Sequence, residues 1–428
     1  MSIKTITTII WILLLNLIML AQTKLTLEEA INFGLKKNLV LEKTLLQEKS
    51  YELNIKQSYG NLLPDLNATA GYSNTNSKNF FGKTNSNNYS AGISSNVVLF
   101  DGLANLYTID KQKVSYDVYT KQLERLKQQI VYNVSELYYN TLMQFYLVQV
   151  DEETVKWNEK NLEYITSKYN LGSVTRADLY NQQMKLGLAK SKLITNKNNY
   201  QALKDQLINY IGLDILENYE LASPEIEIDS IVLDNELKKY QNIYNLIDDA
   251  MKNRFDLQAQ KLNLELSKYD YKIALGGFYP SLSAGWNFNF NSDKFSNFGK
   301  YYNNTFSLNL SIPIFNRFSV DTRVQQLGIT QNIREKEILE LERNIKTELK
   351  KNLLDLYNSV ENYLVSRQTV ISAQENKKII EEKYKLGAET LMNLMLAEVD
   401  YVNAKTQKIT AVFDIYKNLA KIKYLTGK

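Results

Sequence analysis

The stretch KYNLG at residues 168–172 decides the fold, because the chain repeats it as KYKLG at residues 383–387, a shift of 215 positions. Other landmarks recur at this offset or one residue from it: Leu99-Phe100 with Ile314-Phe315, Gly212 with Gly427, and Pro64 with Pro280. Several landmarks at one offset indicate an internal duplication. Each pentapeptide is typical of a helix end at which Gly, after Leu, takes the left-handed conformation. We therefore predict two copies of one unit, each containing a helix-to-helix turn.

The composition predicts long elements and excludes several kinds of chemistry. The 428 residues include only 4 Pro and 16 Gly, so few positions interrupt a helix or strand. The chain has no Cys and no His, which excludes thiolate zinc sites, disulfides, and thiol or imidazole catalysis. Its 51 basic and 47 acidic residues are mixed, so no nucleic-acid partner is predicted. Thirty Tyr, 15 Phe and 3 Trp suit membrane interfaces as well as cores.

The N-terminus has the layout of a secretory signal peptide, which we place at residues 1–21. Lys4 precedes a mostly apolar run from Ile6 to Leu20, and the small residue Ala21 follows. A membrane anchor is the alternative, but the run is shorter than the roughly 20 residues that a spanning helix needs. We therefore expect an exported protein.

Two pairs of short segments alternate between apolar and polar residues. They cover residues 65–74 and 88–100 in the first copy, joined by a polar loop, and residues 281–291 and 305–315 in the second. Strands of about ten residues with one apolar face match transmembrane β-strands, although a soluble sheet alternates in the same way. The residues expected to face the membrane are Leu66, Tyr72, Ile93, Trp286, Phe288, Phe290, Phe306, Leu308 and Leu310.

The remaining sequence predicts helices of two lengths. Residues 102–170 and 317–385 each form one long helix, with apolar residues at 3-4-4 spacing and a length of about 100 Å. Two shorter helices, at 26–60 (with an interruption expected near Asn38) and at 174–211, together match the length of one long helix. We expect the returning helix of one copy to stack on the opening helix of the other. The domains are then a first repeat at 22–212, an equatorial linker at 213–242 and a second repeat at 243–428.

The predicted fold is mainly α with a small β part, built from a duplicated helix–β-hairpin–long helix–short helix unit. Four strands per chain cannot close a membrane barrel, since about eight is the minimum and open edges are not tolerated in lipid. If the strands lie in a membrane, the chain must oligomerise.

Five segments accompany the two Leu-Gly turns in a fixed order: LTLEEAINFGLKKN (25–38), GNLLPDL (60–66), LFDG (99–102), FYPSL (278–282) and PIFN (313–316). On these turns and segments, the sequence resembles the TolC-like outer-membrane efflux protein family over essentially its whole mature length. The resemblance implies a homotrimer in the outer membrane of a Gram-negative-type bacterium, with a twelve-stranded β-barrel continuing into a periplasmic α-helical barrel. The implied role is the exit duct of a tripartite efflux or type I secretion system. The implied partners are outer-membrane lipid, a periplasmic adaptor (membrane fusion) protein and an inner-membrane pump of RND or ABC type.

The resemblance also assigns roles at the periplasmic tip. The surface for docking the adaptor maps onto Tyr169, Leu171, Gly172, Tyr384, Leu386 and Gly387. The alternative is that these six residues only reverse the direction of the chain between two helices. A periplasmic gate maps onto Asp178, Glu389, Asn393 and Leu396.

The gate positions depart from those of some relatives. Asp178 matches an acidic position that ties the closed tip together in relatives, although a carboxylate in a first helical turn is favourable anyway. Glu389 replaces a basic residue, and Asn393 and Leu396 replace an inward ring of Asp, so the same closure is not expected. Leu391, Met392, Met395 and Leu396 could form an apolar constriction instead, with ordinary interhelical packing as the alternative.

Two other classes of function compete with the duct. One is an exported coiled-coil scaffold without a pore, and the other is an envelope hydrolase built on carboxylates. Neighbouring carboxylates such as Glu152 and Glu153 point in different directions on a helix, so no catalytic residue is assigned. We likewise expect no cofactor and no metal site.

Overall fold

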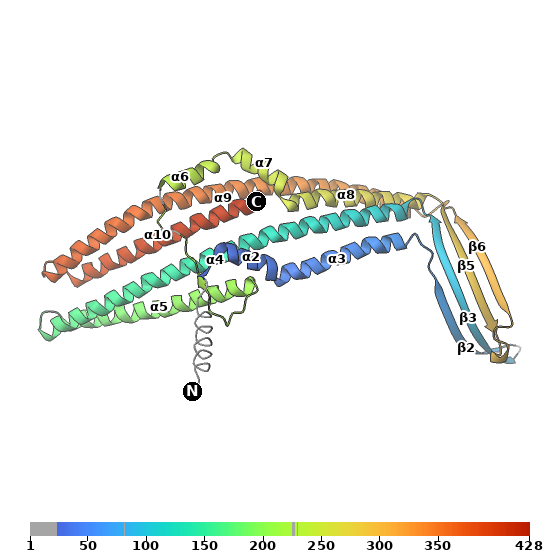
Figure 1. The fold of residues 1–428 in the computed structure, drawn as a ribbon, viewed down its shortest axis with the longest axis horizontal. Helices are drawn as coiled ribbons and strands as arrows, with labels where there is room; N and C mark the ends of the chain where they lie inside the picture. Colours follow the sequence, from blue (N-terminus) through green and yellow to red (C-terminus); the bar gives the residue numbers. More distant parts are fainter. Residues whose placement is uncertain (1–23, 81, 225–226, 229) are drawn as a thin grey trace, which may run out of the picture. The chain divides into compact units, whose positions relative to one another are not determined.

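The computed structural model describes residues 24–80, 82–224, 227–228 and 230–428 (Figure 1). The predicted signal peptide at 1–21 lies outside the described residues. The chain divides into two compact units, which we describe separately. The helical unit comprises residues up to Glu42, Arg125–Arg254 and Arg343–Lys428, and the sheet unit comprises Lys43–Glu124 and Phe255–Glu342.

The order of the elements confirms the duplication. The first copy contains α2 (Leu27–Lys37), α3 (Leu39–Gly60), β2 (Asn67–Asn79), β3 (Gly82–Phe100), α4 (Ala104–Asn170) and α5 (Arg176–Tyr210). The second copy contains α7 (Ile243–Asn253), α8 (Phe255–Leu275), β5 (Ser281–Ser292), β6 (Tyr302–Ser311), α9 (Ser319–Lys385) and α10 (Leu391–Thr426). Both long helices, α4 and α9, have 67 residues. The same six elements therefore follow one another twice.

The opening helix of each copy is interrupted at the same place. Asn38 separates α2 from α3 in an extended conformation, and its side-chain Oδ1 accepts the backbone N–H groups of Val40 and Leu41 at 3.0 and 3.2 Å. Arg254 separates α7 from α8 in a similar extended conformation. The break expected near Asn38 is confirmed.

Within the helical unit, each returning helix meets the opening helix of its own copy. The Asn38 Nδ2 group donates to the Tyr210 carbonyl at 2.8 Å. A Cβ atom added to Gly212, whose φ is +73°, would lie 2.4 Å from the Lys37 carbonyl oxygen, so only glycine permits this approach. In the second copy, a Cβ atom added to Gly427 would lie 2.8 Å from the Asn253 carbonyl oxygen. The prediction that the returning helix of one copy stacks on the opening helix of the other copy is wrong. The prediction rested on helix lengths, and the two opening helices have similar lengths, so length could not show which of them each returning helix meets.

The linker between the copies is more ordered than its broken periodicity indicates. It contains β4 (Glu220–Leu221), which pairs in parallel with β1 (Lys24–Leu25), and α6 (Ser230–Lys239). The buried Tyr138 hydroxyl lies 2.9 Å from the Leu25 carbonyl oxygen and 2.5 Å from that of Ala222, and thereby fixes this small sheet to α4.

The sheet unit contains one antiparallel sheet in the order β2-β3-β5-β6. β2 and β6 are its edge strands among the described residues. The polar loop expected between residues 74 and 88 is wrong, because β2 continues to Asn79 and β3 begins at Gly82. The apolar alternation ends near Tyr72, so hydrophobic periodicity could not reveal this polar continuation.

Candidate functional site

One face of the four-stranded sheet is mainly apolar across all four strands, with polar exceptions such as Ser95 and Asn304. Trp286 lies opposite Phe306, Ala284 opposite Leu308, and Leu282 opposite Leu310. Directly opposed residues of antiparallel strands share a face. The pairs between β2 and β3 and between β3 and β5 continue this face through Ala68, Ala70, Tyr72, Tyr89, Ala91, Ile93, Phe288 and Phe290. The other face carries Ser, Thr, Asn and Gly, with Val98 as an apolar exception. All predicted membrane-facing residues within the strands therefore share one face, and Leu66 directly precedes β2.

The apolar face is also exposed. Phe306, Leu308 and Leu310 are 74%, 59% and 63% exposed. Monomeric soluble proteins rarely leave a contiguous apolar surface of this kind uncovered. A covering medium or partner is therefore required.

Aromatic side chains gather at the level of the sheet where β5 ends. The Phe288 ring lies 5.0 Å from Phe290 and 5.6 Å from Tyr302, and Tyr72 lies 4.9 Å from Tyr89, all between ring centroids. Aromatic residues at one level of an apolar surface are typical of a membrane–water interface.

In the helical unit, the two helix-to-helix turns have the same backbone structure. Gly172 and Gly387 have φ values of +74° and +75°. The Ser173 N–H donates to the Lys168 carbonyl at 2.9 Å, and the Ala388 N–H donates to the Lys383 carbonyl at 2.9 Å. These bonds are those of a Schellman motif, in which a left-handed glycine ends the helix. Figure 1 shows the turns closing the α4–α5 and α9–α10 pairs.

The side chains of the two turns differ. Tyr169 is 37% exposed, whereas its equivalent Tyr384 is 6% exposed and packs with Ile165, Leu391, Leu394 and Met395. Burial, with smaller contributions from Tyr164 and Asp178, raises the pKa of Tyr384 to about 12. The expectation that Tyr384 forms part of a docking surface does not fit this burial. Leu171 and Leu386, at 80% and 84% exposed, do lie on the surface.

The carboxylates assigned to the gate are held in local helix caps. Asp178 accepts hydrogen bonds from the Thr175 N–H at 3.0 Å and the Thr175 hydroxyl at 2.7 Å, which makes a capping box at the start of α5. In the second copy, the Asn393 Nδ2 group donates to Glu389 Oε1 at 2.6 Å. This bond, together with one from the Thr390 N–H, lowers the pKa of Glu389. Asp178 thus caps its helix, as the first-turn alternative predicted.

The four residues considered for an apolar constriction separate into two pairs. Leu391 and Met395 are buried in the cluster around Tyr384, so interhelical packing accounts for them. Met392 and Leu396 are 68% and 57% exposed on α10. Together with Asp178 and Met184 they line a pocket beside α5.

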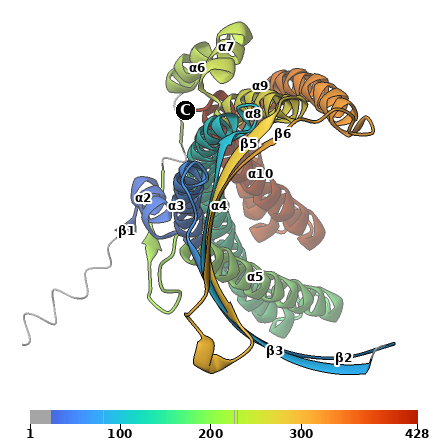
Figure 2. The same ribbon diagram turned by 90° about the vertical axis from the view of Figure 1, so that its right-hand side faces the viewer.

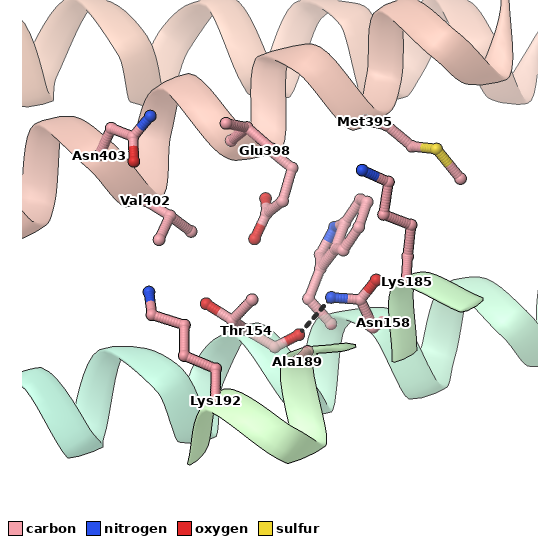
Figure 3. Close-up of a pocket in the computed structure, with 11 residues that line it drawn as sticks. Thr154, Asn158, Lys185, Ala189, Lys192, Met395, Glu398, Val402 and Asn403 are labelled. Atoms are coloured by element: carbon pink, nitrogen blue, oxygen red, sulfur yellow. Dashed lines mark hydrogen bonds between the residues drawn. The ribbon is translucent and has the colours of Figure 1, made fainter. Parts of the chain in front are cut away.

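A second pocket near the turns borders a buried ion pair that the sequence analysis missed. Thr154 and Asn158 of α4, Lys185 and Lys192 of α5, and Glu398 of α10 line it (Figure 3). Glu398 is 5% exposed and forms an ion pair with Lys377 of α9. The Lys377 amine also lies 5.5 Å from the Trp157 ring centroid and 4.8 Å from that of Tyr401. Burial raises the pKa of Glu398, and the Lys377 amine opposes this shift.

A signal for this pair was present in the sequence. Lys377 and Glu398 lie ten residues before and eleven residues after Gly387. Positions at nearly equal distances from the turn of an antiparallel helical hairpin face each other, so opposite charges there predict an ion pair.

Comparison with known proteins identifies the family. The model of the family described as "Outer membrane efflux protein" matches residues 31–213 and 246–428, which is one match for each copy. The chain belongs to the outer membrane efflux protein family. The chain is therefore an outer-membrane efflux channel of the kind found in tripartite efflux systems of Gram-negative bacteria, and not an enzyme.

Individual members of the outer membrane efflux protein family are distant from this chain. Outer membrane protein TolC of Salmonella enteritidis is 22% identical over 384 residues, which cover 87% of this chain and 76% of that protein. The probable efflux pump outer membrane protein TtgC of Pseudomonas putida is 21% identical over 413 residues, covering 92% and 82%. The crystal structure of the Campylobacter jejuni CmeC outer membrane channel has a TM-score of 0.76 at 15% identity and covers 94% of this chain and 85% of that chain. The family fold is thus kept at low sequence identity.

In the part of the chain that the structure describes, no helix is both long enough and apolar enough to cross a bilayer.

Proposed function

We propose that three copies of this channel protein assemble into a homotrimer whose twelve strands form one outer-membrane β-barrel. The observation that carries the proposal is the four-stranded sheet with one exposed apolar face and two edge strands, β2 and β6. Unpaired strand edges are not tolerated in lipid, so β6 of one copy must pair with β2 of the next. The apolar face then contacts lipid, and the face of Ser, Thr, Asn and Gly lines the lumen.

We further propose that the chain is organised as a first repeat at residues 22–212, an equatorial linker at 213–242 and a second repeat at 243–428. The α4–α5 and α9–α10 pairs of three copies would form the periplasmic helical barrel. Their turns would dock a periplasmic adaptor protein, which connects the duct to an inner-membrane pump of RND or ABC type. The duct is passive, and the pump selects the substrate.

The oligomer and its pore can be tested together. The protein should require detergent for extraction from the outer membrane, have the mass of a trimer in that detergent, and conduct ions in planar bilayers. A soluble monomer without conductance would contradict the channel assembly and favour the exported scaffold.

The exposed leucines of the turns should contribute to adaptor binding. Leu171→Asp with Leu386→Asp is expected to weaken binding of the cognate adaptor roughly 30-fold, because exposed apolar anchors at an interface carry about 2 kcal/mol. Surface plasmon resonance with the purified adaptor measures the change. Leu216→Asp, an equally exposed leucine at 89% in the loop after α5, is the control and should bind normally. If the wild type, the Leu171/Leu386 double variant and the Leu216 variant bind the adaptor with equal affinity, the turns serve only to reverse the chain.

Leu396 is the residue that we propose narrows the lumen near the turns. Leu396→Asp should increase single-channel conductance in planar bilayers and favour cations, because it removes an apolar constriction and adds a carboxylate. Leu396→Asn, which is matched in size and uncharged, should increase the conductance without the change in selectivity. If both variants carry the wild-type current, Leu396 has no gating role.

A further inference from the structure

The hairpin formed by β2 and β3 extends beyond the rest of the sheet. β3 pairs with β5 only from Tyr89 onward, whereas residues 82–88 of β3 pair with β2 alone. Figure 2 shows β2 and β3 curving away from β5 and β6 toward their connecting turn. We call residues 73–79 and 82–88 the β2–β3 ribbon. The ribbon extends past the aromatic residues Tyr72 and Tyr89, so contact with lipid acyl chains does not account for its surface.

One face of the ribbon continues the apolar face of the sheet with a different chemistry. In register beyond the Tyr72–Tyr89 pair come Asn74 opposite Asn87, Asn76 opposite Asn85, and Lys78 opposite Lys83. The amide groups form a connected ladder. The Asn74 Nδ2 group donates to Asn87 Oδ1 at 2.7 Å and to Asn85 Oδ1 at 2.8 Å, and the Tyr72 hydroxyl donates to Asn87 Oδ1 at 3.1 Å. This face therefore changes from aromatic rings to amides and then to amines.

The two lysines at the end of the ladder have like charges in directly opposed positions, an arrangement that destabilises a strand pair. The sequence from Leu66 to Phe100 contains no Asp or Glu, so the hairpin itself provides no carboxylate. Lys78 and Lys83 are both exposed, and among the described residues neither forms an ion pair. An external anion would relieve the repulsion between the two amines.

The position of the lysines identifies which anion can reach them. Lys78 lies six positions after Tyr72 along β2, which is about 20 Å at 3.3 Å per residue. If the apolar face contacts lipid, as the proposed function requires, the tyrosines lie at the membrane interface. The asparagines and lysines then lie outside the acyl region, at the depth of the sugars of outer-leaflet glycolipids.

We propose that this face of the β2–β3 ribbon binds the anionic saccharide head group of an outer-leaflet glycolipid. The asparagine amides provide donors and acceptors for sugar hydroxyls, and the two ammonium groups bind a phosphate carried by the saccharide. The site is continuous with the lipid-facing surface, so a glycolipid whose acyl chains lie against the aromatic residues presents its head group to the ladder. This proposal rests on the proposed function, because the face must be turned toward lipid.

The second hairpin offers a matched control. Lys294 and Lys300 lie in the connection between β5 and β6, and the Lys300 amine donates to Asn297 Oδ1 at 3.1 Å. Asp293 precedes Lys294, so this pair of lysines has a carboxylate nearby in sequence. Substituting either pair removes the same formal charge, but of the two pairs only Lys78 and Lys83 lie directly opposite each other at the end of a ladder of amides.

The test measures binding of fluorescently labelled rough lipopolysaccharide, with its phosphorylated core sugars, to the full-length delipidated protein in detergent. Fluorescence anisotropy should show that Lys78→Gln with Lys83→Gln weakens binding about 10- to 30-fold, since each surface amine near an anionic head group contributes roughly a five-fold factor. Lys78→Arg with Lys83→Arg should retain the affinity. The control, Lys294→Gln with Lys300→Gln, should remain within about three-fold of wild type. Added NaCl should weaken wild-type binding more than binding by the Lys78/Lys83 glutamine variant.

Two comparisons determine whether the saccharide is the ligand. Lipid A without core sugars and dephosphorylated lipopolysaccharide should each bind at least ten-fold more weakly than the intact glycolipid. Equal binding of lipid A, or equal affinity of wild type and the Lys78/Lys83 glutamine variant, would overturn the proposed site. Conductance of the same wild-type preparation separates the two proposals. A preparation that conducts but does not bind overturns only the glycolipid site, whereas one that neither conducts nor forms a trimer overturns the proposed channel assembly and the site that depends on it.

Discussion

Leu308→Arg should prevent stable assembly of the protein in the outer membrane, whereas Asn309→Arg should be tolerated. Leu308 lies in β6 opposite Ala284 on the apolar face, and Asn309 lies opposite Ser283 on the other face. An arginine facing lipid near the middle of a bilayer costs about 2–4 kcal/mol, so three copies in a trimer cost on the order of 6–12 kcal/mol. The measurements are the amount of protein in the outer-membrane fraction and the trimer band in unheated SDS gels.

The neighbouring substitution makes this comparison specific. Both variants introduce the same side chain into the same edge strand, and they differ only in the face that it occupies. Normal assembly of both variants would show that the apolar face does not contact lipid, as the scaffold alternative requires. Loss of assembly in both would mean that β6 tolerates no arginine on either face, and the comparison would then contradict a lumen-facing Asn309.

Lys377→Met should cause the second large effect, a loss of about 3–5 kcal/mol in the stability of the helical unit. The substitution leaves the carboxylate of Glu398, which is 5% exposed, without its ion-pair partner. Lys377→Met combined with Glu398→Leu should recover most of the loss, because an apolar pair of similar size can replace a buried ion pair. Thermal unfolding followed by helical circular dichroism measures the change. The control is Lys385→Met, which breaks a 2.9 Å ion pair with Glu381 at 58% and 37% side-chain exposure and should cost less than about 1 kcal/mol.

The loss caused by Lys377→Met should depend on pH with a definite sign. Burial raises the pKa of Glu398, so the folded chain holds this proton more tightly than the unfolded chain. The stability gained from protonating Glu398 is fully present below the pKa that this group has in the unfolded chain, and it is lost as pH rises through its pKa in the folded chain. The free energy of unfolding of Lys377→Met should therefore fall further below that of Lys377→Met/Glu398→Gln as pH rises from the acidic range. A deficit that is independent of pH would contradict the assignment to an unpaired Glu398 carboxylate.

Much of the fold could be predicted from the sequence, because its main signals are local and occur twice. The Leu-Gly turns, the long helices and the one-sided alternation around Trp286 and Leu308 each follow from residue spacing, and the register confirms the shared face. The extension of β2 to Asn79 could not be predicted in this way. Its Asn, Ser and Thr residues have no apolar period, and cross-strand amide contacts hold the ribbon together.

The candidate site was harder to predict, because duplication makes two positions equivalent in the sequence but not in their surroundings. Tyr169 and Tyr384 occupy the same turn position, and only packing against Ile165 and Met395 buries the second. Asp178 and Asn393 also occupy equivalent positions, and the different caps that they form became visible only from the hydrogen bonds.

This difference between Tyr169 and Tyr384 has a consequence for the symmetry of the proposed trimer. In that trimer, three chains would place six turns with nearly the same backbone around one ring, which suggests six equivalent positions. The alternation of an exposed and a buried tyrosine would reduce the ring to three-fold symmetry. A partner that offers identical contacts around the ring therefore meets two classes of position, and its binding should saturate in two steps of three.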